Sequence, residues 1–596
     1  MVETKEGYFI PEESFTSFVC LNGLPLPLYL ALYSHDTAMA TSTSTTTDLH
    51  VGEVNGDSPA ATKPDYDVIV IGAGFGGLRA LHEFRKLGLS TKIIEAGTGV
   101  GGTWYWNRYP GARTDSESWV YIVNFSKELK AEWVWTERYP TQKEVLAYLD
   151  HVADRFDMRK DIQFSSRVKS AHYDEAKNIW TITTEKGDSY TSTFFIPASG
   201  VLSIGRKPPF PGVDSFKGEW YQTSSWPKER VDFVGKRVAV VGTGATGVQV
   251  VPIVAHHAKS VTVFQRTANY VIPGRNHALT EDQLQEIKRN YDEIWNKARG
   301  QVFGFPMETY GRTIDSVKDE AEHQRILEAG WESGGFRFVF ETFDDLLTND
   351  KSNEAAAAFV RNKIHTIVKD PKTADLLSPN YPLLAKRPPL GHFYYEAFNR
   401  PNVKLVDISN DPIQEITPQG IRTGTAEYEF DTIIYAIGFD AGTGALIQMD
   451  VRGKNNRSLS EEWSKRLETY LGITVEGYPN MFMITGPQSP FANIPVVIDN
   501  TVDWIGKAIS YMRDHGYKRA EPTQGASEKW GDHVKAVFDA TAMARSSATV
   551  HSWFVGANVP GKPLAALFYF GGVAAYFEHC EKEAAAGFPD LKFSST

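Results

Sequence analysis

The sequence of 596 residues predicts an α/β fold with two parallel-sheet units and a helical insertion in the second unit. Two segments, "VIVIGAGFGGLRAL" and "VAVVGTGATGVQVV", each join an apolar strand to a helix through a glycine-rich turn. After the second segment, residues 279–375 have the apolar spacing of helices. A chain of this length also exceeds one ordinary core, so several domains are expected.

The N-terminal residues 1–63 differ in composition from the rest and are expected to form a variable, disordered extension. Their second half is polar and rich in Ser and Thr, which leaves too little apolar surface for a core. The apolar run before it is interrupted by Asn22, Gly23, Pro25 and Pro27, and no basic segment precedes it. We therefore expect neither a membrane span nor a signal peptide here.

The first glycine-rich turn fits the pattern G-x-G-x-x-G directly after the strand Asp67–Ile71. In this pattern Gly72 permits a tight turn, Gly74 lets the backbone approach a pyrophosphate, and Gly77 lets the helix pack against the strand. The helix N-terminus then faces the phosphates, and an acid after the next strand binds ribose hydroxyls. The residues expected to bind a dinucleotide in this unit are Gly72, Gly74, Phe75, Gly77 and Glu95.

The second glycine-rich turn follows the strand Val238–Val241, and no acid ends the next strand. Arg266 stands there instead, and a guanidinium can pair with a 2′-phosphate through two hydrogen bonds. This residue favours NADPH over NADH, although a solvated surface arginine would look the same in sequence. The residues expected to bind the second dinucleotide are Gly242, Thr243, Gly244, Ala245, Thr246, Gly247, Arg266 and Thr267.

Two Rossmann-like dinucleotide-binding domains, one for FAD and one for NADP, account for both turns. The chain has two cysteines, Cys20 and Cys580, and no C-x-x-C pair, which argues against a dithiol reductase or a cysteine zinc site. So few cysteines fit a reducing, cytoplasmic location. We therefore expect electrons to pass from NADPH to FAD and from FAD to O2.

The domain order follows from the segments around the two turns. Apolar and polar residues alternate between the turns, with hairpins expected near Asn178 and Gly187. The helical insertion is expected at about 277–381, after which "EYEFDTIIYAIGFDA" returns to strand spacing and carries the chain back to the first domain. The predicted ranges are 64–206 and 436–596 for the FAD-binding domain and 207–435 for the NADP-binding domain.

Two longer motifs resemble the fingerprints of the type I Baeyer–Villiger monooxygenases. "GGTWYWNRYPGARTD", residues 101–115, fits (A/G)-G-x-W-x4-(F/Y)-P-(G/M)-x3-D at every specified position. "FKGEWYQTSSWP", residues 216–227, fits F-x-G-x3-H-x3-W-(P/D) except that Gln222 replaces the histidine. Together with other similar stretches, the resemblance covers about Tyr66 to Phe593.

This resemblance implies a two-domain flavoprotein whose reduced flavin reacts with O2 to give a C4a-peroxyflavin. The peroxide would attack the carbonyl of a small-molecule ketone. A carbon then migrates to oxygen, and the product is an ester or a lactone. The resemblance also implies that the oxidised nicotinamide stays bound across a cleft between the domains.

The resemblance further implies roles for individual residues. Arg387 in "AKRPP" matches the catalytic arginine, and a permanent cation suits an oxygen-derived anion in a dry site. Asp115 would fix that guanidinium, although it could also cap a helix at "SESWVYIV". Lys386 matches a residue that reaches the 2′-phosphate, and Trp553 matches a loop that closes over NADPH, unless it is a core tryptophan. The other matched cofactor contacts are Thr103, Trp104, Tyr105, Trp106, Tyr121 and Val168.

Two alternative functions stay open. A related flavin monooxygenase could oxygenate nitrogen or sulfur, although such relatives lack the long fingerprint and usually lack the arginine motif. The other alternative is a flavoprotein with impaired oxygenation, because Gln222 offers a donor and an acceptor but cannot carry charge.

Composition limits the partners of the chain. A net charge of −11 argues against a general nucleic-acid surface, and we expect a monomer or a weak dimer. His151, His256 and His257 fall on predicted helices, and no pair of them has metal-ligand spacing together with an acid. We therefore expect no metal site.

Overall fold

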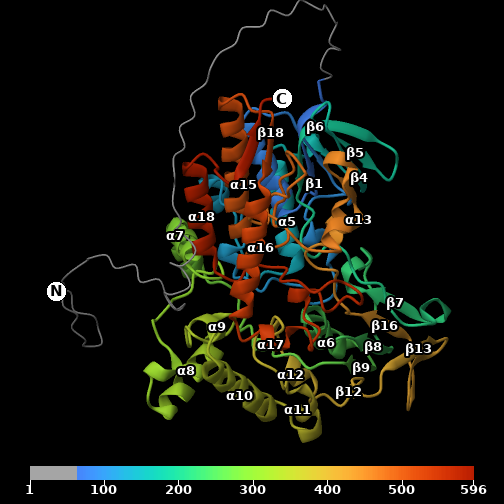
Figure 1. Cartoon of the computed structure of the whole chain (residues 1–596). Helices are drawn as coiled ribbons and strands as arrows, with labels where there is room; N and C mark the ends of the chain where they lie inside the picture. Colours follow the sequence, from blue (N-terminus) through green and yellow to red (C-terminus); the bar gives the residue numbers. More distant parts are fainter. Residues whose placement is uncertain (1–62) are drawn as a thin grey trace, which may run out of the picture. The chain divides into compact units, whose positions relative to one another are not determined.

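The computed structural model describes residues 63–596 (Figure 1). The expectations for residues 1–62 therefore lie outside the described residues. Within the described range, a seven-stranded sheet and a five-stranded sheet form the framework of the fold. No helix in this range is long and apolar enough to cross a membrane.

The seven-stranded sheet has the order β17-β4-β5-β6-β1-β2-β3. Its strands are β1 (Tyr66–Ile71), β2 (Thr91–Ile94), β3 (Ile162–Gln163), β4 (Val168–Asp174), β5 (Ile179–Thr184), β6 (Ser189–Pro197) and β17 (Asp450–Arg452). Strand β1 pairs in parallel with both β2 and β6, and Ile71 lies in register with Ile94 and Pro197. The C-terminal ends of three strands therefore meet beside Gly72.

The predicted strand–turn–helix unit and the predicted hairpins are present in this sheet. Val68, Ile69 and Val70 are fully buried, as expected for a parallel strand covered on both faces. The antiparallel pairs β4–β5 and β5–β6 turn near Asn178 and Gly187, which have φ values of 56° and 92°. These two positions confirm the expected turns, because glycine and asparagine tolerate such left-handed conformations.

The five-stranded sheet has the order β12-β9-β8-β16-β7, and all its pairs are parallel. Its strands are β7 (Glu219–Gln222), β8 (Arg237–Val241), β9 (Ser260–Gln265), β12 (Val403–Asp407) and β16 (Thr432–Tyr435). The strand expected in "EYEFDTIIYAIGFDA" is interrupted: β15 (Glu427–Glu429) joins a small antiparallel sheet with β13 (Ile413–Thr417) and β14 (Gly420–Thr423), and only β16 joins the parallel sheet. Both large sheets agree with the predicted α/β fold class.

One helix follows each glycine-rich turn, and a group of helices lies between β9 and β12. The helices after the turns are α2 (Phe75–Lys86) and α6 (Ala245–His257). The expected insertion contains α7 (Glu281–Gly300), α8 (Glu320–Ser333), α9 (Arg337–Phe340), α10 (Asp350–Ile367) and α11 (Pro371–Leu377). In Figure 1 the yellow-green ribbons of α8, α9 and α10 lie together in the lower part of the view, whereas α7 lies beside the C-terminal helix α18 (Val573–Ala585).

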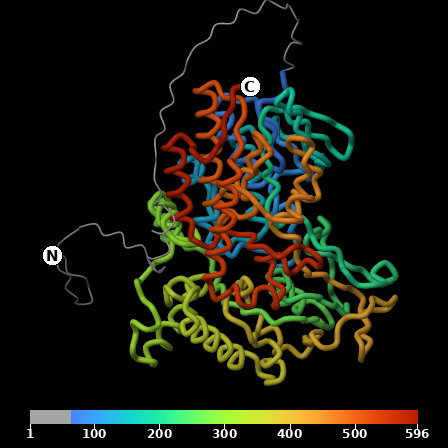
Figure 2. Tube along the Cα trace, viewed as in Figure 1, coloured from blue at the N-terminus to red at the C-terminus, as the bar shows by residue number. Residues whose placement is uncertain are grey.

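C-terminal helices complete the packing around the first sheet. The main ones are α15 (Ile494–Asp514), α16 (Gln524–Asp539) and α18 (Val573–Ala585). Figure 2 shows the red and orange C-terminal segments running beside the blue N-terminal strands, and α15 packs directly on α2. Arg79 on α2 is buried and pairs with Glu83 on its own helix and with Asp499 and Asp503 on α15.

Candidate active site

A cavity of about 1340 Å³ receives both glycine-rich turns. Gly72 and Gly74 line it from the end of β1, and Gly242 and Gly244 line it from the end of β8. The carboxyl ends of parallel strands are the usual ligand-binding edge of such sheets. The cavity is therefore placed to take two dinucleotides together.

The first glycine-rich turn has the backbone geometry that a dinucleotide requires. Gly72 has a φ of +103°, and a Cβ on Gly77 would lie 1.9 Å from the carbonyl oxygen of Gly72. Only glycine lets α2 begin this close to β1, so its N-terminus faces the cavity. Glu95 is buried after β2 and accepts from the backbone N–H groups of Ala73 at 2.7 Å and Gly97 at 2.6 Å. These residues fit the diphosphate and ribose of FAD.

The second turn repeats this arrangement and leaves free space at its middle glycine. A Cβ on Gly247 would lie 2.2 Å from the carbonyl oxygen of Gly242, whereas a Cβ on Gly244 would have no heavy atom within 4 Å. The open side of Gly244 leaves room for a phosphate at the N-terminus of α6. The turn therefore fits a second dinucleotide.

Two cations beside the second turn suit an extra phosphate. Arg266 and Lys386 line the cavity, and neither makes an ion pair with another described residue. Burial and, secondarily, the charge of Arg266 lower the pKa of Lys386 to about 8. Cations without protein anions nearby favour an anionic ligand such as the 2′-phosphate of NADP.

The ion pair between Arg387 and Asp115 lies in the same cavity. Arg387 Nη1 donates to Asp115 Oδ2 at 2.7 Å, with side-chain exposures of 27 % and 6 %. Burial raises the pKa of the Asp115 carboxyl, and Arg387 opposes that rise. The backbone N–H of Leu390 also faces this carboxylate and lowers its pKa, and the guanidinium carbon of Arg387 lies 5.4 Å from the ring centre of Phe336. A cation is thus held between a carboxylate and an aromatic ring.

The helix considered after Asp115 is not present. Residues 118–120 form only the short 3₁₀ turn η1 (Ser118–Val120), and its N-cap position is Glu117, without a side-chain cap. The carboxylate of Asp115 bonds to Arg387 instead. A single turn has too few unpaired N–H groups to compete for a buried carboxylate that already has a guanidinium partner.

Aromatic residues from the long fingerprint and from other segments line the cavity. Trp104 Nε1 donates to the hydroxyl of Tyr121 at 3.2 Å, and Phe75 meets the Tyr121 ring edge-on at 5.1 Å. Burial raises the pKa of Tyr121 to about 12, so its hydroxyl stays protonated at neutral pH. Trp553 packs at 5.8 Å on Phe491, partly buried in the cavity wall.

Most predicted site residues line this one cavity, and three do not. The predicted residues in the lining are Gly72, Gly74, Phe75, Glu95, Thr103, Trp104, Trp106, Asp115, Tyr121, Val168, Gly242, Thr243, Gly244, Ala245, Thr246, Arg266, Thr267, Lys386, Arg387 and Trp553. Gly77 and Gly247 pack beneath their own turns. The hydroxyl of Tyr105 turns to Thr98, whose backbone N–H donates to it at 2.9 Å, and Lys228 lies over its ring at 5.3 Å.

Other cavity residues were not found by sequence reasoning. Phe336 and Phe340 reach the cavity from the helical insertion, and Arg206 reaches it from the segment before β7. These residues stand in no motif, because their contacts join segments far apart in the chain. Only a three-dimensional arrangement brings them to the site.

Gln222 lies at the end of β7 and bonds to the chain segment before that strand. Its Nε2 donates to the carbonyl of Arg206 at 2.8 Å and to the hydroxyl of Ser224 at 2.7 Å. Arg206 in turn donates from its backbone N–H to the carbonyl of Gly438 at 3.0 Å. Gln222 therefore ties the end of β7 to the segment around Arg206, and Arg206 in turn bonds to the second connecting segment at Gly438.

The three histidines on predicted helices lie in helices. His151 is in α5 (Gln142–Arg155) and lies 2.9 Å from Glu132, while His256 and His257 end α6. Among residues 63–596, no group of His, Cys, Asp and Glu side chains could hold a metal ion.

The comparisons with known proteins agree with this geometry. Residues 65–280 match the family described as flavin-binding monooxygenase-like. A Baeyer–Villiger monooxygenase of Pseudooceanicola batsensis is 43% identical over 515 residues, covering 86% of this chain and 93% of the relative. Cyclohexanone 1,2-monooxygenase of an Acinetobacter species is 42% identical (88% and 97% covered), and phenazine N-monooxygenase of Lysobacter antibioticus is 41% identical (86% and 94% covered).

Solved structures are similar to the chain at nearly the same sequence identity as these relatives. Cyclohexanone monooxygenase from Rhodococcus sp. Phi1 bound to NADP⁺ superposes with a TM-score of 0.86 at 40% identity, covering 89% of this chain and 99% of that one. The OTEMO complex with FAD and NADP gives 0.86 at 39% identity, covering 89% and 100%.

Two glycine-rich turns that face one cavity, without a redox cysteine pair in residues 63–596, define a flavin- and nicotinamide-dependent oxidoreductase. Within that class, the chain belongs to the Baeyer–Villiger monooxygenase family of flavin-binding monooxygenases, and its cofactors are FAD and NADPH.

Proposed function

We propose that this enzyme inserts one oxygen atom from O2 beside the carbonyl of a small-molecule ketone and releases an ester or a lactone. The relatives named for cyclohexanone and for Baeyer–Villiger oxidation support a ketone as the substrate class. The single observation that carries the proposal is the Arg387–Asp115 ion pair in the cavity shared by both glycine-rich turns.

The seven-stranded sheet would hold FAD, and the five-stranded sheet would hold NADPH. FAD would lie against Gly72, Gly74 and Glu95, with Thr103, Trp104, Trp106, Tyr121 and Val168 around it. NADPH would lie against the turn at Gly242–Gly247, with its 2′-phosphate at Arg266 and Lys386. Bound flavin, once reduced by NADPH, supplies the activated oxygen for the reaction.

Arg387 would stabilise the negative charge that develops on the ketone oxygen when its carbonyl carbon is attacked. A guanidinium provides this charge on a planar group with several N–H donors. Asp115 orients it and holds one of its N–H groups, which leaves the others free for the substrate. Fixed donors of this kind act on the transition state without reorganising.

Aromatic side chains would keep water away from this centre. Phe336, Phe340, Phe491 and Phe568 line the cavity, and Phe491 packs against Trp553. A low-polarity wall strengthens the interaction of Arg387 with a developing anion. We propose that Trp553, on a segment that carries no long helix, closes over the nicotinamide.

Oxygenation of nitrogen is the second candidate, because phenazine N-monooxygenase is 41% identical to this chain. Gln222 favours a third reading, a flavoprotein with impaired oxygenation. We further propose that the protein works in the cytoplasm as a monomer or weak dimer that does not bind nucleic acid, in keeping with its net charge of −11.

The masses of the products distinguish these three candidate functions. The purified holoenzyme is incubated with NADPH, O2 and a panel of small, cyclic and polycyclic ketones, a thioether and a phenazine. Esters or lactones support the proposal, whereas exclusive sulfoxide or N-oxide products contradict it. Anaerobic bleaching of the flavin by NADPH, followed by peroxide but no oxygenated product in air, would support impaired oxygenation.

A further inference from the structure

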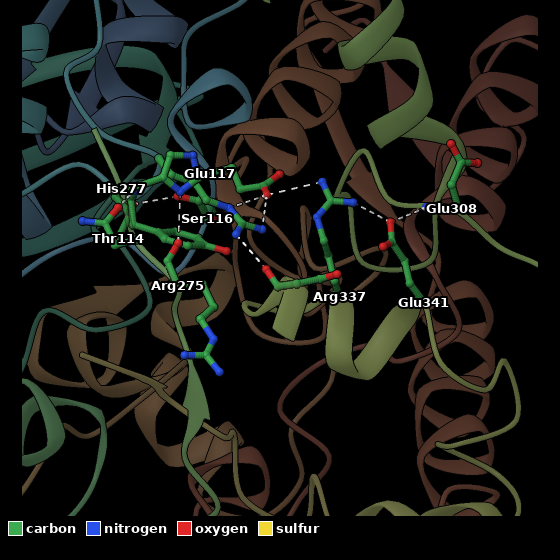
Figure 3. Close-up of polar contacts among 12 residues, drawn as sticks. Thr114, Ser116, Glu117, Arg275, His277, Glu308, Arg337 and Glu341 are labelled. Atoms are coloured by element: carbon green, nitrogen blue, oxygen red, sulfur yellow. Dashed lines mark hydrogen bonds and ion pairs between the residues drawn. The ribbon is translucent and has the colours of Figure 1, made fainter. Parts of the chain in front are cut away.

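A second buried carboxylate lies two residues after Asp115. Figure 3 shows Glu117, Arg337, Glu341 and Glu308 joined in a row of polar contacts. Arg138 donates from Nε and Nη2 to Glu117 Oε1 at 3.0 and 2.8 Å, and Arg337 Nη2 lies 3.4 Å from the same oxygen. Glu117 is 1 % exposed, so guanidiniums and not solvent compensate its charge.

This carboxylate joins the two segments that carry the partners of Arg387. Glu117 follows Asp115, whose carboxylate holds the guanidinium. Arg337 follows Phe336, whose ring lies 5.4 Å from the same guanidinium. The Glu117–Arg337 contact therefore links the anionic partner of Arg387 to its aromatic partner.

Further bonds anchor the link on the side of the insertion. Arg138 Nη1 donates to the carbonyl of Ser333 at 2.8 Å, at the end of α8. Arg337 Nη1 donates to Glu341 Oε1 at 2.6 Å, and this oxygen also accepts from the backbone N–H of Glu308 at 3.0 Å. The beginning of α9, with Phe336 next to it, is therefore held from both sides.

The segment of Asp115 is held as firmly. The backbone N–H of Ser118 donates to the carbonyl of Arg138 at 2.8 Å, and that of Thr114 donates to the carbonyl of Pro140 at 3.1 Å. The hydroxyl of Ser116 donates to Asn493 Oδ1 at 2.9 Å. These bonds fix the Asp115 segment beside the segment of Arg138. The contact between Glu117 and Arg337 therefore sets the position of α9 relative to Asp115.

We propose that Glu117 and Arg337 are positioning residues for Arg387, an inference that rests on the catalytic role proposed for that arginine. Their contact holds the segment of Asp115 and the segment of Phe336 at a fixed separation. The guanidinium between them then keeps one orientation toward the substrate. Without the contact, α9 separates from the Asp115 segment and Arg387 samples orientations that do not meet the ketone oxygen.

The alternative is a network that only stabilises the fold, and a matched variant distinguishes the two. Glu521 on β18 (Arg519–Pro522) is also a buried carboxylate, bonded to Lys454 at 2.9 Å and to the backbone N–H of Gly477 at 3.0 Å. None of these three residues lines the cavity. E521Q therefore imposes a comparable loss of buried charge away from Arg387.

Amide exchange gives a readout that needs no turnover. The N–H of Leu390 lies close enough to the Asp115 carboxylate to lower its pKa, and positions 388 and 389 are prolines without an N–H. A short peptide that covers residues 387–391 therefore reports on the position of Asp115. Hydrogen–deuterium exchange is measured on the holoenzyme for wild type, E117Q, R337M, R337K and E521Q, together with the Tm and with kcat and KM for a converted ketone.

E117Q and R337M are expected to speed exchange in that peptide and to lower kcat for product about 10- to 100-fold, with KM for the ketone changed much less. In R337K, which keeps the positive charge, the exchange rate and kcat stay closer to the wild-type values than in R337M. E521Q lowers only the Tm. R337M serves if E117Q does not fold, because Arg138 still balances the charge of Glu117 in that variant.

The positioning role would be wrong if R337M had the exchange rate and kcat of the wild type. It would also be wrong if R337M and E521Q changed the exchange rate, kcat and Tm in the same way. A wild-type enzyme that converts no ketone would instead contradict the proposed function. The exchange measurement needs no substrate, so it decides the positioning role in either case.

Discussion

Arg387 and Asp115 lie 272 positions apart in sequence, and their side chains form a hydrogen-bonded ion pair of 2.7 Å. The arginine follows the helical insertion, and the aspartate closes the long fingerprint near the first glycine-rich turn. Neither segment can order the site alone. The orientation of the cation therefore depends on how the two sheets are held together.

Replacing Arg387 with lysine is expected to lower product formation about 100-fold or more. An ammonium is a compact point charge and cannot bind Asp115 and a substrate oxygen with the fixed fork of a guanidinium. Ester or lactone and hydrogen peroxide are measured per NADPH consumed. R289K on α7, an exposed arginine paired with Glu286, is the control. Product at the wild-type rate in R387K would remove Arg387 from the mechanism.

The affinity for NADP⁺ is expected to fall as the pH rises above about 8. The pKa of Lys386 is lowered to about 8, so its ammonium is lost there and not near 10. Binding of the 2′-phosphate then takes up a proton above this pH, whereas binding of NAD⁺ does not. Titration calorimetry in buffers of different ionisation enthalpy measures that proton.

K386R is the control for this pH dependence, because arginine stays charged throughout. Its affinity for NADP⁺ should be nearly constant over the same range. An affinity of the wild type that does not change between about pH 7 and 9.5 would mean that Lys386 does not contact the phosphate.

Alanine at two glycines of the second turn should give different defects. In G247A the new methyl would meet the carbonyl oxygen of Gly242 at 2.2 Å, so the turn must open and the Tm falls. In G244A no heavy atom lies within 4 Å and φ is an ordinary −76°, so the Tm stays unchanged. The methyl of G244A instead occupies the space of a phosphate and raises the Kd for NADPH. Equal Kd values for G244A and wild type would place the cofactor elsewhere.

Q222H is expected to give a pH dependence that the wild type lacks. The amide of Gln222 donates to the Arg206 carbonyl and to Ser224 without carrying charge. A neutral imidazole has one N–H and can donate to only one of these acceptors, whereas the imidazolium formed below about pH 6.5 has two N–H donors. Product formed per NADPH should therefore vary between about pH 6 and 7.5 in Q222H only. Unchanged NADPH oxidation, peroxide release and pH profile would show that this position does not couple the segments.

Local patterns in the sequence were sufficient to predict most of the fold. Strand, glycine turn and helix follow one another in both units, and the positive φ at Gly72 and the close packing at Gly77 are encoded within a few residues. The strand expected in "EYEFDTIIYAIGFDA" was wrong in part, because Glu427–Glu429 pairs with β14. Periodicity predicts a strand but does not identify its partner.

Site residues that belong to a sequence motif could be predicted, and site residues outside any motif could not. The long fingerprint and "AKRPP" pointed to Asp115 and Arg387, which the fold brings into contact. Phe336 and Glu117 carry no comparable signal. Their importance depends on contacts between α9 and the fingerprint segment, and such contacts are visible only in three dimensions.

The pairing of α2 with α15 has a consequence for how the protein is made. Arg79 emerges from the ribosome early, whereas Asp499 and Asp503 follow only after both large sheets have been synthesised. Until then this guanidinium has only Glu83 of its own helix as a carboxylate partner, and the face of α2 that α15 covers stays exposed to chaperones. Nascent chains that stop before residue 494 should therefore be degraded even though they contain every glycine of both nucleotide-binding turns.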